Sequence, residues 1–354
     1  MVAVARRSNN FDCLRLIFAS LVIVSHATAF VDGDVHRELF HCIFGTTLMG
    51  EVAVDGFFLI SGFLIVKSWI RNPHLSSFLR KRINRIYPGF IVASCISVFL
   101  VGPLAGSSTF LEDLGLGKFL SGLLFLVGPY CPPVFRGTYF ANINGSLWTI
   151  AYEFRCYLLV AVLGIFGLTH KKWIWLGVAL VAIGLSYVPG MTEVKVPDWA
   201  HLIVPDVSHS LHFLALFGIG ATYCLFEDRI RWDDRVAAGA LLLMIGLLFI
   251  PALAQIAIAV PGSYLLFWFA NRETPSLNWF RNLPDISYGV YLYGWPTEKL
   301  LLWYLPNLGP WLLMGFSLLI SFGLGYLSWL LVERRFLSGR SRETAPFRTA
   351  LPDV

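Results

Sequence analysis

The chain has 354 residues, of which 56% are hydrophobic and only 14% are charged. This small number of polar side chains cannot cover a soluble globule of this length. The composition therefore excludes a soluble enzyme and predicts a polytopic membrane protein. The formal net charge of +5 is no argument for a nucleic-acid partner, because positive residues are retained in the cytoplasmic loops of any membrane protein.

Hydropathy along the chain predicts an all-α fold with about ten transmembrane helices around a polar cavity. Segments near the roughly 20 residues that a bilayer requires are expected at 11–30, 46–66, 88–106, 145–167, 173–190, 209–226, 236–250, 252–270, 286–304 and 310–332. The two segments beside Pro251 are short. The apolar stretch from Gly117 to Pro129 is too short to cross, so we expect a re-entrant or interfacial segment there.

The distribution of Lys and Arg sets the expected orientation. With a cytoplasmic N-terminus, 20 of them fall in inner segments and five lie outside or near the outer face. Both termini are therefore expected in the cytoplasm, with a membrane domain at 1–335 and a short basic tail at 336–354. A cleavable signal peptide is the alternative at the N-terminus, but Asp12 and Arg15 interrupt the run into its apolar core.

The cysteines predict neither a disulfide framework nor a metal site. Only Cys42 and Cys131 are both expected outside, where they could pair, while small apolar fillers are the simpler interpretation. No cluster has metal-ligand spacing.

Arg15 and His26 lie on one stripe of the first span. Eleven residues rotate a helix by nearly three full turns and climb about 16 Å, so the two side chains project on one side at different depths. A buried Arg costs on the order of 3 kcal/mol or more in lipid and usually faces a functional polar cavity. Imidazole is also the natural group for proton transfer near neutral pH, although His26 could simply bond a neighbouring helix.

Two acids lie well inside predicted spans, Asp55 in the second and Glu153 in the fourth. Such carboxylates should line a wet cavity or form a structural ion pair, for instance Asp55 with Arg15 or Glu153 with Arg155. We favour lining of the active site, where either acid could orient His26 or bond an acceptor hydroxyl.

A basic cluster is expected in the second inner loop, at Arg80, Lys81, Arg82 and Arg85. Guanidinium groups bind phosphate through paired, charge-assisted donors, so this cluster could hold a phosphorylated donor, although topology alone also places basic residues there.

Several further residues are weaker candidates. Ser61 precedes Gly62, and the pair permits a close backbone approach that suits either donor binding or tight helix packing. Aromatic residues that could stack on or bond a sugar, or belong to interfacial belts, are Trp148, Tyr152, Tyr288 and Tyr291. Glu333 ends the last span, where pairing with Arg334 or another basic residue is its simplest role.

Five ordered motifs resemble the acyltransferase-3 family of integral membrane O-acyltransferases. They are Arg15 with His26, VDGFFLISGFL at 54–64, RKRINRIYP at 80–88, NGSLWTIAYE at 144–153 and ISYGVYLYGWP at 286–296. The resemblance implies that Arg15 and His26 are essential, that Arg82 and Arg85 form the family's Arg-x-x-Arg, and that acetyl-CoA or another acyl-CoA is the donor. It also implies a functional role for the acid at Glu333.

The sequence departs from the family pattern at two positions. Gly294 stands where the motif Tyr-Leu-x-His-x-Pro has His, and Arg335 stands where Pro is common. The first difference removes a second possible catalytic His and weakens the expectation for the acceptor more than that for acyl transfer. With only a short tail after the last span, we expect a stand-alone form without a hydrolase-like periplasmic domain.

The sequence as a whole predicts a bacterial inner-membrane O-acyltransferase of the O-acetyltransferase type. It would move an acyl group from cytoplasmic acyl-CoA to a hydroxyl of a glycan or lipid-linked sugar, with His26 as general base or transient acyl carrier. Expected partners are acyl-CoA, the saccharide and membrane lipids, with no nucleic acid and no metal. The alternatives are a transporter of a small anion or sugar, or an acyltransferase acting on a lipid or secreted metabolite.

Overall fold

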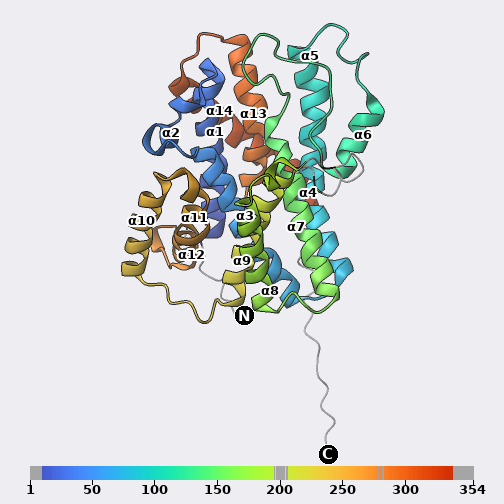
Figure 1. The fold of residues 1–354 in the computed structure, drawn as a ribbon. Coiled ribbons are helices and arrows are strands. Elements are labelled where there is room, and N and C mark those ends of the chain that lie inside the picture. The colour runs from blue at the N-terminus through green and yellow to red at the C-terminus, as the bar shows by residue number, and fades with distance from the viewer. Residues whose placement is uncertain are drawn as a thin grey trace, which may run out of the picture.

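The computed structural model describes residues 10–194, 196, 204, 206–277, 279–280 and 283–337. Within these ranges the chain forms helices and no strand (Figure 1). The helices are α1 Phe11–Asp32, α2 Leu39–Phe44, α3 Met49–Arg71, α4 Leu75–Ile96, α5 Gly102–Ala105, α6 Leu116–Phe125, α7 Trp148–Ile165, α8 Lys172–Ser186, α9 Val207–Leu225, α10 Asp234–Leu248, α11 Ala254–Ala257, α12 Ser263–Asn271, α13 Ser287–Tyr304, α14 Pro310–Ser328 and α15 Arg334–Leu337. Short π-helical turns continue α4 into α5, α11 into α12 and α14 into α15.

The all-α, polytopic prediction is confirmed. Each of the ten expected spans overlaps a helix, and six helical segments among the described residues are long and apolar enough to cross a membrane. Most of the tail, residues 338–354, lies outside the described residues, as do Arg6, Arg7, Lys195 and Arg281 from the orientation argument.

The third span begins much earlier than predicted. Its helix starts at Leu75 and continues to Ala105, so the basic cluster at 80–85 lies on α4 and not in a loop. Arg, Lys and Leu favour helix, and hydropathy alone ended the predicted span where these charges begin. The consequence is that the cluster has a fixed helical spacing.

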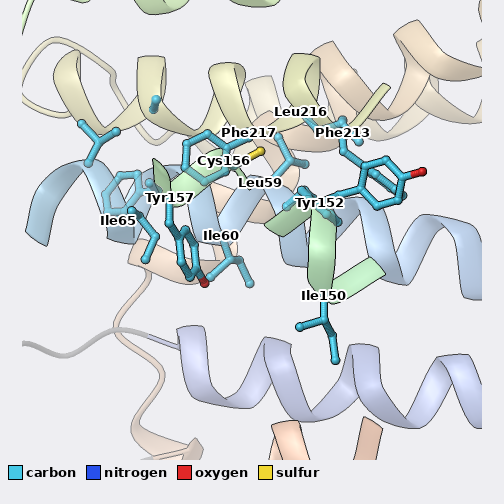
Figure 2. Close-up of a cluster of buried hydrophobic side chains, with 14 of the residues drawn as sticks. Leu59, Ile60, Ile65, Ile150, Tyr152, Cys156, Tyr157, Phe213, Leu216 and Phe217 are labelled. Carbon is cyan, nitrogen blue, oxygen red and sulfur yellow. The ribbon is translucent and has the colours of Figure 1, made fainter. Parts of the chain in front are cut away.

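Helix α3 lies at the centre of the bundle, where it packs against α1, α7 and α9. Figure 2 shows part of this core, in which Leu59 and Ile60 of α3 meet aromatic and aliphatic side chains from α7 and α9. Two glycines allow α3 and α9 to touch through their backbones. A Cβ at Gly62 would lie 2.0 Å from the carbonyl oxygen of Phe217, and one at Gly220 would lie 2.0 Å from that of Leu59. Small residues at such crossings are the usual basis of close packing between membrane helices.

A proline in α13 is compensated by the segment before α7. Pro296 has no N–H to donate to the carbonyl of Leu292, one turn earlier. The side-chain amide of Asn144 donates to that carbonyl instead, at 3.0 Å, and its oxygen accepts from the N–H of Ser146. The motifs at 144–153 and 286–296 therefore meet in space at this point.

The short apolar segment forms α6, a helix of ten residues. The residue that follows it is Leu126, whose φ of 58° turns the chain back. The hydroxyl of Tyr87 on α4 donates to the carbonyl of Leu124 at 2.7 Å. The helix is too short to cross a bilayer, and its depth in the membrane stays a prediction. Cys42 and Cys131 are both free thiols in the structure.

Candidate active site

A cavity opens between α1, α3, α4, α7 and the start of α13. The space between its walls amounts to about 640 Å³, part of it open to the outside. Its walls combine apolar with charged and hydroxyl side chains, which are Arg15, Val54, Phe57, Phe58, Arg85, Ile86, Thr149, Ile150, Glu153, Tyr157, Ser287, Tyr288 and Tyr291.

Two arginines of the cavity share one carboxylate. The guanidinium of Arg15 lies 3.1 Å from Asp285, and that of Arg85 lies 2.6 Å from the same oxygen. Arg85 also lies 3.7 Å from Glu333, which is 1% exposed and accepts a hydrogen bond from Ser328. Asp285 thus joins α1 to α4, and both arginines are held in fixed positions.

Asp285 lies in the loop before α13 and is held ionised. Burial alone would raise the pKa of its carboxyl, but Arg85, Arg15 and the hydrogen bonds from Ser287 outweigh burial and hold the pKa well below its usual range. The carboxylate is therefore a permanent counter-charge for the two arginines.

Glu153 lies in the cavity wall within a small hydrogen-bond network. Ser61 donates to its carboxylate at 2.7 Å, and the hydroxyl of Tyr157 donates to the same oxygen. Ser61 also lies 3.3 Å from the Tyr157 hydroxyl. The structure thus brings the predicted residues Ser61 and Glu153 together.

Tyr288 and Tyr291 line the cavity on α13. Tyr288 donates to the carbonyl of Ile86 at 2.9 Å, and the hydroxyl of Tyr291 lies 2.7 Å from that of Thr149. These hydrogen bonds fix Tyr288 against α4 and Tyr291 against α7, which gives the cavity a defined shape.

His26 lies beyond the end of this cavity and is not part of its lining. Its ring stacks on Phe30 at 5.3 Å and meets Trp295 edge-on at 5.0 Å. Trp295 is one turn after Tyr291 on α13, which amounts to roughly 6 Å of helical rise. The imidazole therefore sits about one turn further along the bundle than the wall formed by Tyr291.

One of the predicted alternatives was an ion pair between Asp55 and Arg15, and the structure does not contain it. It is buried in α3, and its carboxylate lies 2.6 Å from Nε2 of His212 on α9. Arg15 takes Asp285 instead, because that acid lies beside the first turns of α1. Asp55 is also not among the residues that line the cavity.

The two aromatic candidates of α7 lie outside the cavity. Trp148 is 43% exposed, and its ring meets those of Tyr152 and His209 edge-on. Tyr152 packs on Phe213 of α9. These side chains belong to the contact between α7 and α9, away from Tyr288 and Tyr291.

The basic residues of α4 divide between the cavity and the surface. Arg85 turns into the cavity, whereas Arg80 is exposed and Lys81 is half-buried. Arg82 donates to Ser68 at 3.3 Å and lies over the rings of Phe78 and Tyr157. The Arg-x-x-Arg spacing thus places Arg82 and Arg85 one turn apart, with Arg85 reaching further in.

Sequence reasoning missed Asp285 and Glu298. Asp285 stands two residues before α13, in a loop, where the rule for acids inside spans did not apply. Glu298 lies inside the predicted span 286–304, so the rule that singled out Asp55 and Glu153 could have found it. Glu298 is fully buried, and its Oε2 lies 3.7 Å from Nδ1 of His26.

The fold and site together define a class, a helical membrane protein with a charged cavity at its centre. A family model described as an acyltransferase domain matches residues 8–330. The chain therefore belongs to the acyltransferase-3 family, as its motifs predicted. No solved structure matches it.

Three relatives match the chain, and the names of two of them agree with this family. An O-acetyl transferase of Shigella phage Sf6 is 30% identical, over 95% of this chain and 98% of the phage protein. Nodulation protein 10 of Rhizobium leguminosarum bv. viciae is 27% identical over 92% of each chain. Acyltransferase MdmB of Streptomyces mycarofaciens is 29% identical over 50% of this chain and 44% of its own length.

Proposed function

We propose that the protein transfers an acyl group, of the acetyl type, from cytoplasmic acyl-CoA to a hydroxyl of a glycan or lipid-linked sugar in the bacterial inner membrane. The observation that carries this proposal is the placement of Arg15 and His26 on one helix, the first in a charged cavity and the second just beyond its far end. Similarity to a phage O-acetyl transferase supports the acyl type.

The donor would enter from the side of the bundle where α1 begins. Arg80, Lys81 and Arg82 supply positive charge for the CoA phosphates on the early turns of α4. Arg85 is already neutralised by Asp285 and Glu333, so we assign it to the cavity wall, past which the pantetheine arm would run. Because the cavity ends near Tyr291, a thioester at that end would approach the ring of His26.

His26 would serve as general base in the transfer step. The acceptor hydroxyl gives its proton to the imidazole while its oxygen attacks the thioester carbon, and the new C–O bond forms as the C–S bond breaks. The CoA thiolate then takes up the proton. In the alternative order, the imidazole itself attacks the thioester and later passes the acyl group to the hydroxyl.

The first test follows donor consumption by the purified protein in detergent. Radiolabelled acetyl-CoA is supplied with a panel of octyl glycosides as hydroxyl acceptors, and both CoA release and labelled glycoside are measured. His26→Ala should lower the rate by about 10²-fold or more, since general base catalysis contributes 10²–10⁴-fold. An unchanged rate in His26→Ala would contradict the assigned role.

A second measurement addresses the acceptor. Mass spectrometry of surface polysaccharides from cells with and without the gene should show O-acetyl groups that depend on it. Polysaccharides that are identical in both strains, together with a changed lipid or secreted metabolite, would point to another acceptor.

A further inference from the structure

Glu298 is a buried carboxylate for which the structure shows no structural use. It is 0% exposed, and neither of its oxygens has a hydrogen-bond partner among the described residues. A carboxylate buried without a partner costs several kcal/mol, about as much as is lost when one member of a buried ion pair is removed. An ionisable group retained at such a cost within a membrane helix usually has a function.

The group nearest to this carboxylate is the ring of His26. Nδ1 of His26 lies 3.7 Å from Oε2 of Glu298, and Nδ1 is likewise buried without a hydrogen-bond partner among the described residues. Phe30 stacks on the ring and Trp295 meets it edge-on, while the indole N–H of Trp295 donates to the carbonyl of Asn142. The aromatic side chains thus hold the ring in the orientation that turns Nδ1 toward Glu298.

Lys299, the next residue along α13, does not pair with Glu298 in place of His26. Nζ of Lys299 donates to Thr138 at 2.8 Å and to the carbonyl of Tyr139, and it lies over the rings of Phe30 and Phe135. Successive residues of a helix point about 100° apart. No ion pair between Lys299 and Glu298 occurs among the described residues, so the carboxylate remains available to the imidazole.

We infer that Glu298 is the positioning residue for His26, and that it accepts a hydrogen bond from Nδ1–H so that Nε2 faces the acceptor hydroxyl. This inference rests on the proposed function, in which His26 acts as base. A base, oriented by a third group that also stabilises its protonated form, is the general arrangement of a Ser-His-Asp triad. The distance of 3.7 Å exceeds a hydrogen bond, and catalytic hydrogen bonds often shorten only when substrate is bound.

Proton transfer explains why such a carboxylate would be retained. When His26 takes the proton from the acceptor hydroxyl, a positive charge forms in a site enclosed by aromatic rings. Glu298 supplies the opposite charge at that moment from a side chain that already lies within 4 Å of the ring. The same carboxylate would favour an acyl-imidazole in the alternative order of steps, because that species is also cationic when first formed.

The test compares Glu298→Gln with the wild type in the acetyl-CoA and octyl glycoside assay. The change preserves shape and removes the charge, so kcat should fall about 10²-fold or more, by analogy with the triad, while KM for acetyl-CoA should change less than threefold. The acidic limb of the pH–rate profile should move to lower pH, because the protonated ring has lost its counter-charge. Glu298→Asp should recover part of kcat, and combining Glu298→Gln with His26→Asn should be no worse than His26→Asn alone.

Glu38→Gln is the matched control. Glu38 is also a buried glutamate, 2% exposed, but it caps α2 by accepting the N–H groups of Phe40 and His41. This variant should keep the pH profile of the wild type. Its thermal midpoint, measured beside that of Glu298→Gln, separates loss of structure from loss of chemistry.

The outcomes separate this inference from the proposed function. Full kcat in Glu298→Gln with loss in His26→Ala would overturn the role of Glu298 and leave acyl transfer standing. A lower kcat with an unmoved pH profile and a lowered thermal midpoint would mean a structural role and would also overturn it. No donor consumption by the wild type with any glycoside would count against the proposed function itself.

Discussion

The two ends of α1 hold their polar groups in opposite ways. Near its start, Arg15 shares Asp285 with Arg85, and distances of 3.1 and 2.6 Å fix both arginines. Near its end, His26 and Glu298 face each other at 3.7 Å without a hydrogen bond. Ion pairs satisfied within the protein hold side chains in fixed positions, whereas an acid and a base left unsatisfied indicate a functional site.

The largest effect is expected where the charges are paired. Asp285→Asn leaves two largely buried arginines with less counter-charge, so we expect a loss of about 3 kcal/mol in the free energy of unfolding. Thermal unfolding of the purified protein in detergent measures it. Asp228→Asn, at an exposed acid, should change little, and an equal effect of both variants would contradict the importance of the shared pair.

The same pair predicts a pH dependence. Because the pKa of Asp285 is lowered in the folded protein, its contribution to stability is present above the unfolded pKa of about 3.9 and is lost as the pH falls toward the folded value. The difference in thermal midpoint between wild type and Asp285→Asn should therefore be constant from about pH 8 to 5 and shrink below about pH 4. A difference that already shrinks near pH 6 would exclude this account.

A smaller effect on stability is expected at the contact between α1 and α13, which lies between Arg15 and His26. A Cβ at Gly294 of α13 would lie 2.7 Å from Cγ1 of Ile23 on α1. Gly294→Ala should therefore destabilise the protein by about 1 kcal/mol, since overpacking outweighs the gain in helix propensity. In a protein that already carries Ile23→Ala, adding Gly294→Ala should cause no further destabilisation. Gly315→Ala on α14 meets no atom within 4 Å and should be neutral or stabilising. Stabilisation by both would show that α1 and α13 are not tightly packed here.

The smallest effect is expected at the turns of α4 that we propose to bind the donor. Arg82→Ala should weaken binding of CoA by about fivefold, roughly 1 kcal/mol, as for a solvated ionic contact, and the difference should fall at high salt. Isothermal titration with CoA measures this. Arg229→Ala removes an exposed arginine from a loop expected on the same side and serves as control, while unchanged affinity in Arg82→Ala would reject the assignment.

Much of the fold could be predicted from sequence because membrane helices require long apolar runs. The start of α4 could not be predicted, because the charged residues from Arg80 to Arg85 lower the hydropathy although they lie within the helix. The stripe of Arg15 and His26 followed from helical geometry alone. Their partners did not, because Asp285 and Glu298 come from the other end of the chain, and only tertiary packing brings α13 against α1.

The same packing explains one departure from the family pattern. Gly294 replaces the usual His in the motif of α13, and the side chain of Ile23 fills the space beside it. A His at this position would collide with α1. We therefore read the glycine as part of the helix contact, which leaves His26 as the imidazole of this region.

The hydrogen bond from Asn144 to the carbonyl freed by Pro296 also limits how relatives can be recombined. The helix that carries Glu298 depends for one of its backbone bonds on an amide supplied from a segment 148 residues earlier. A hybrid enzyme that takes this helix from one parent, and the stretch before α7 from another parent without an amide at this position, would inherit a proline without its donor. Domain exchanges aimed at new acceptor specificity should move both pieces together.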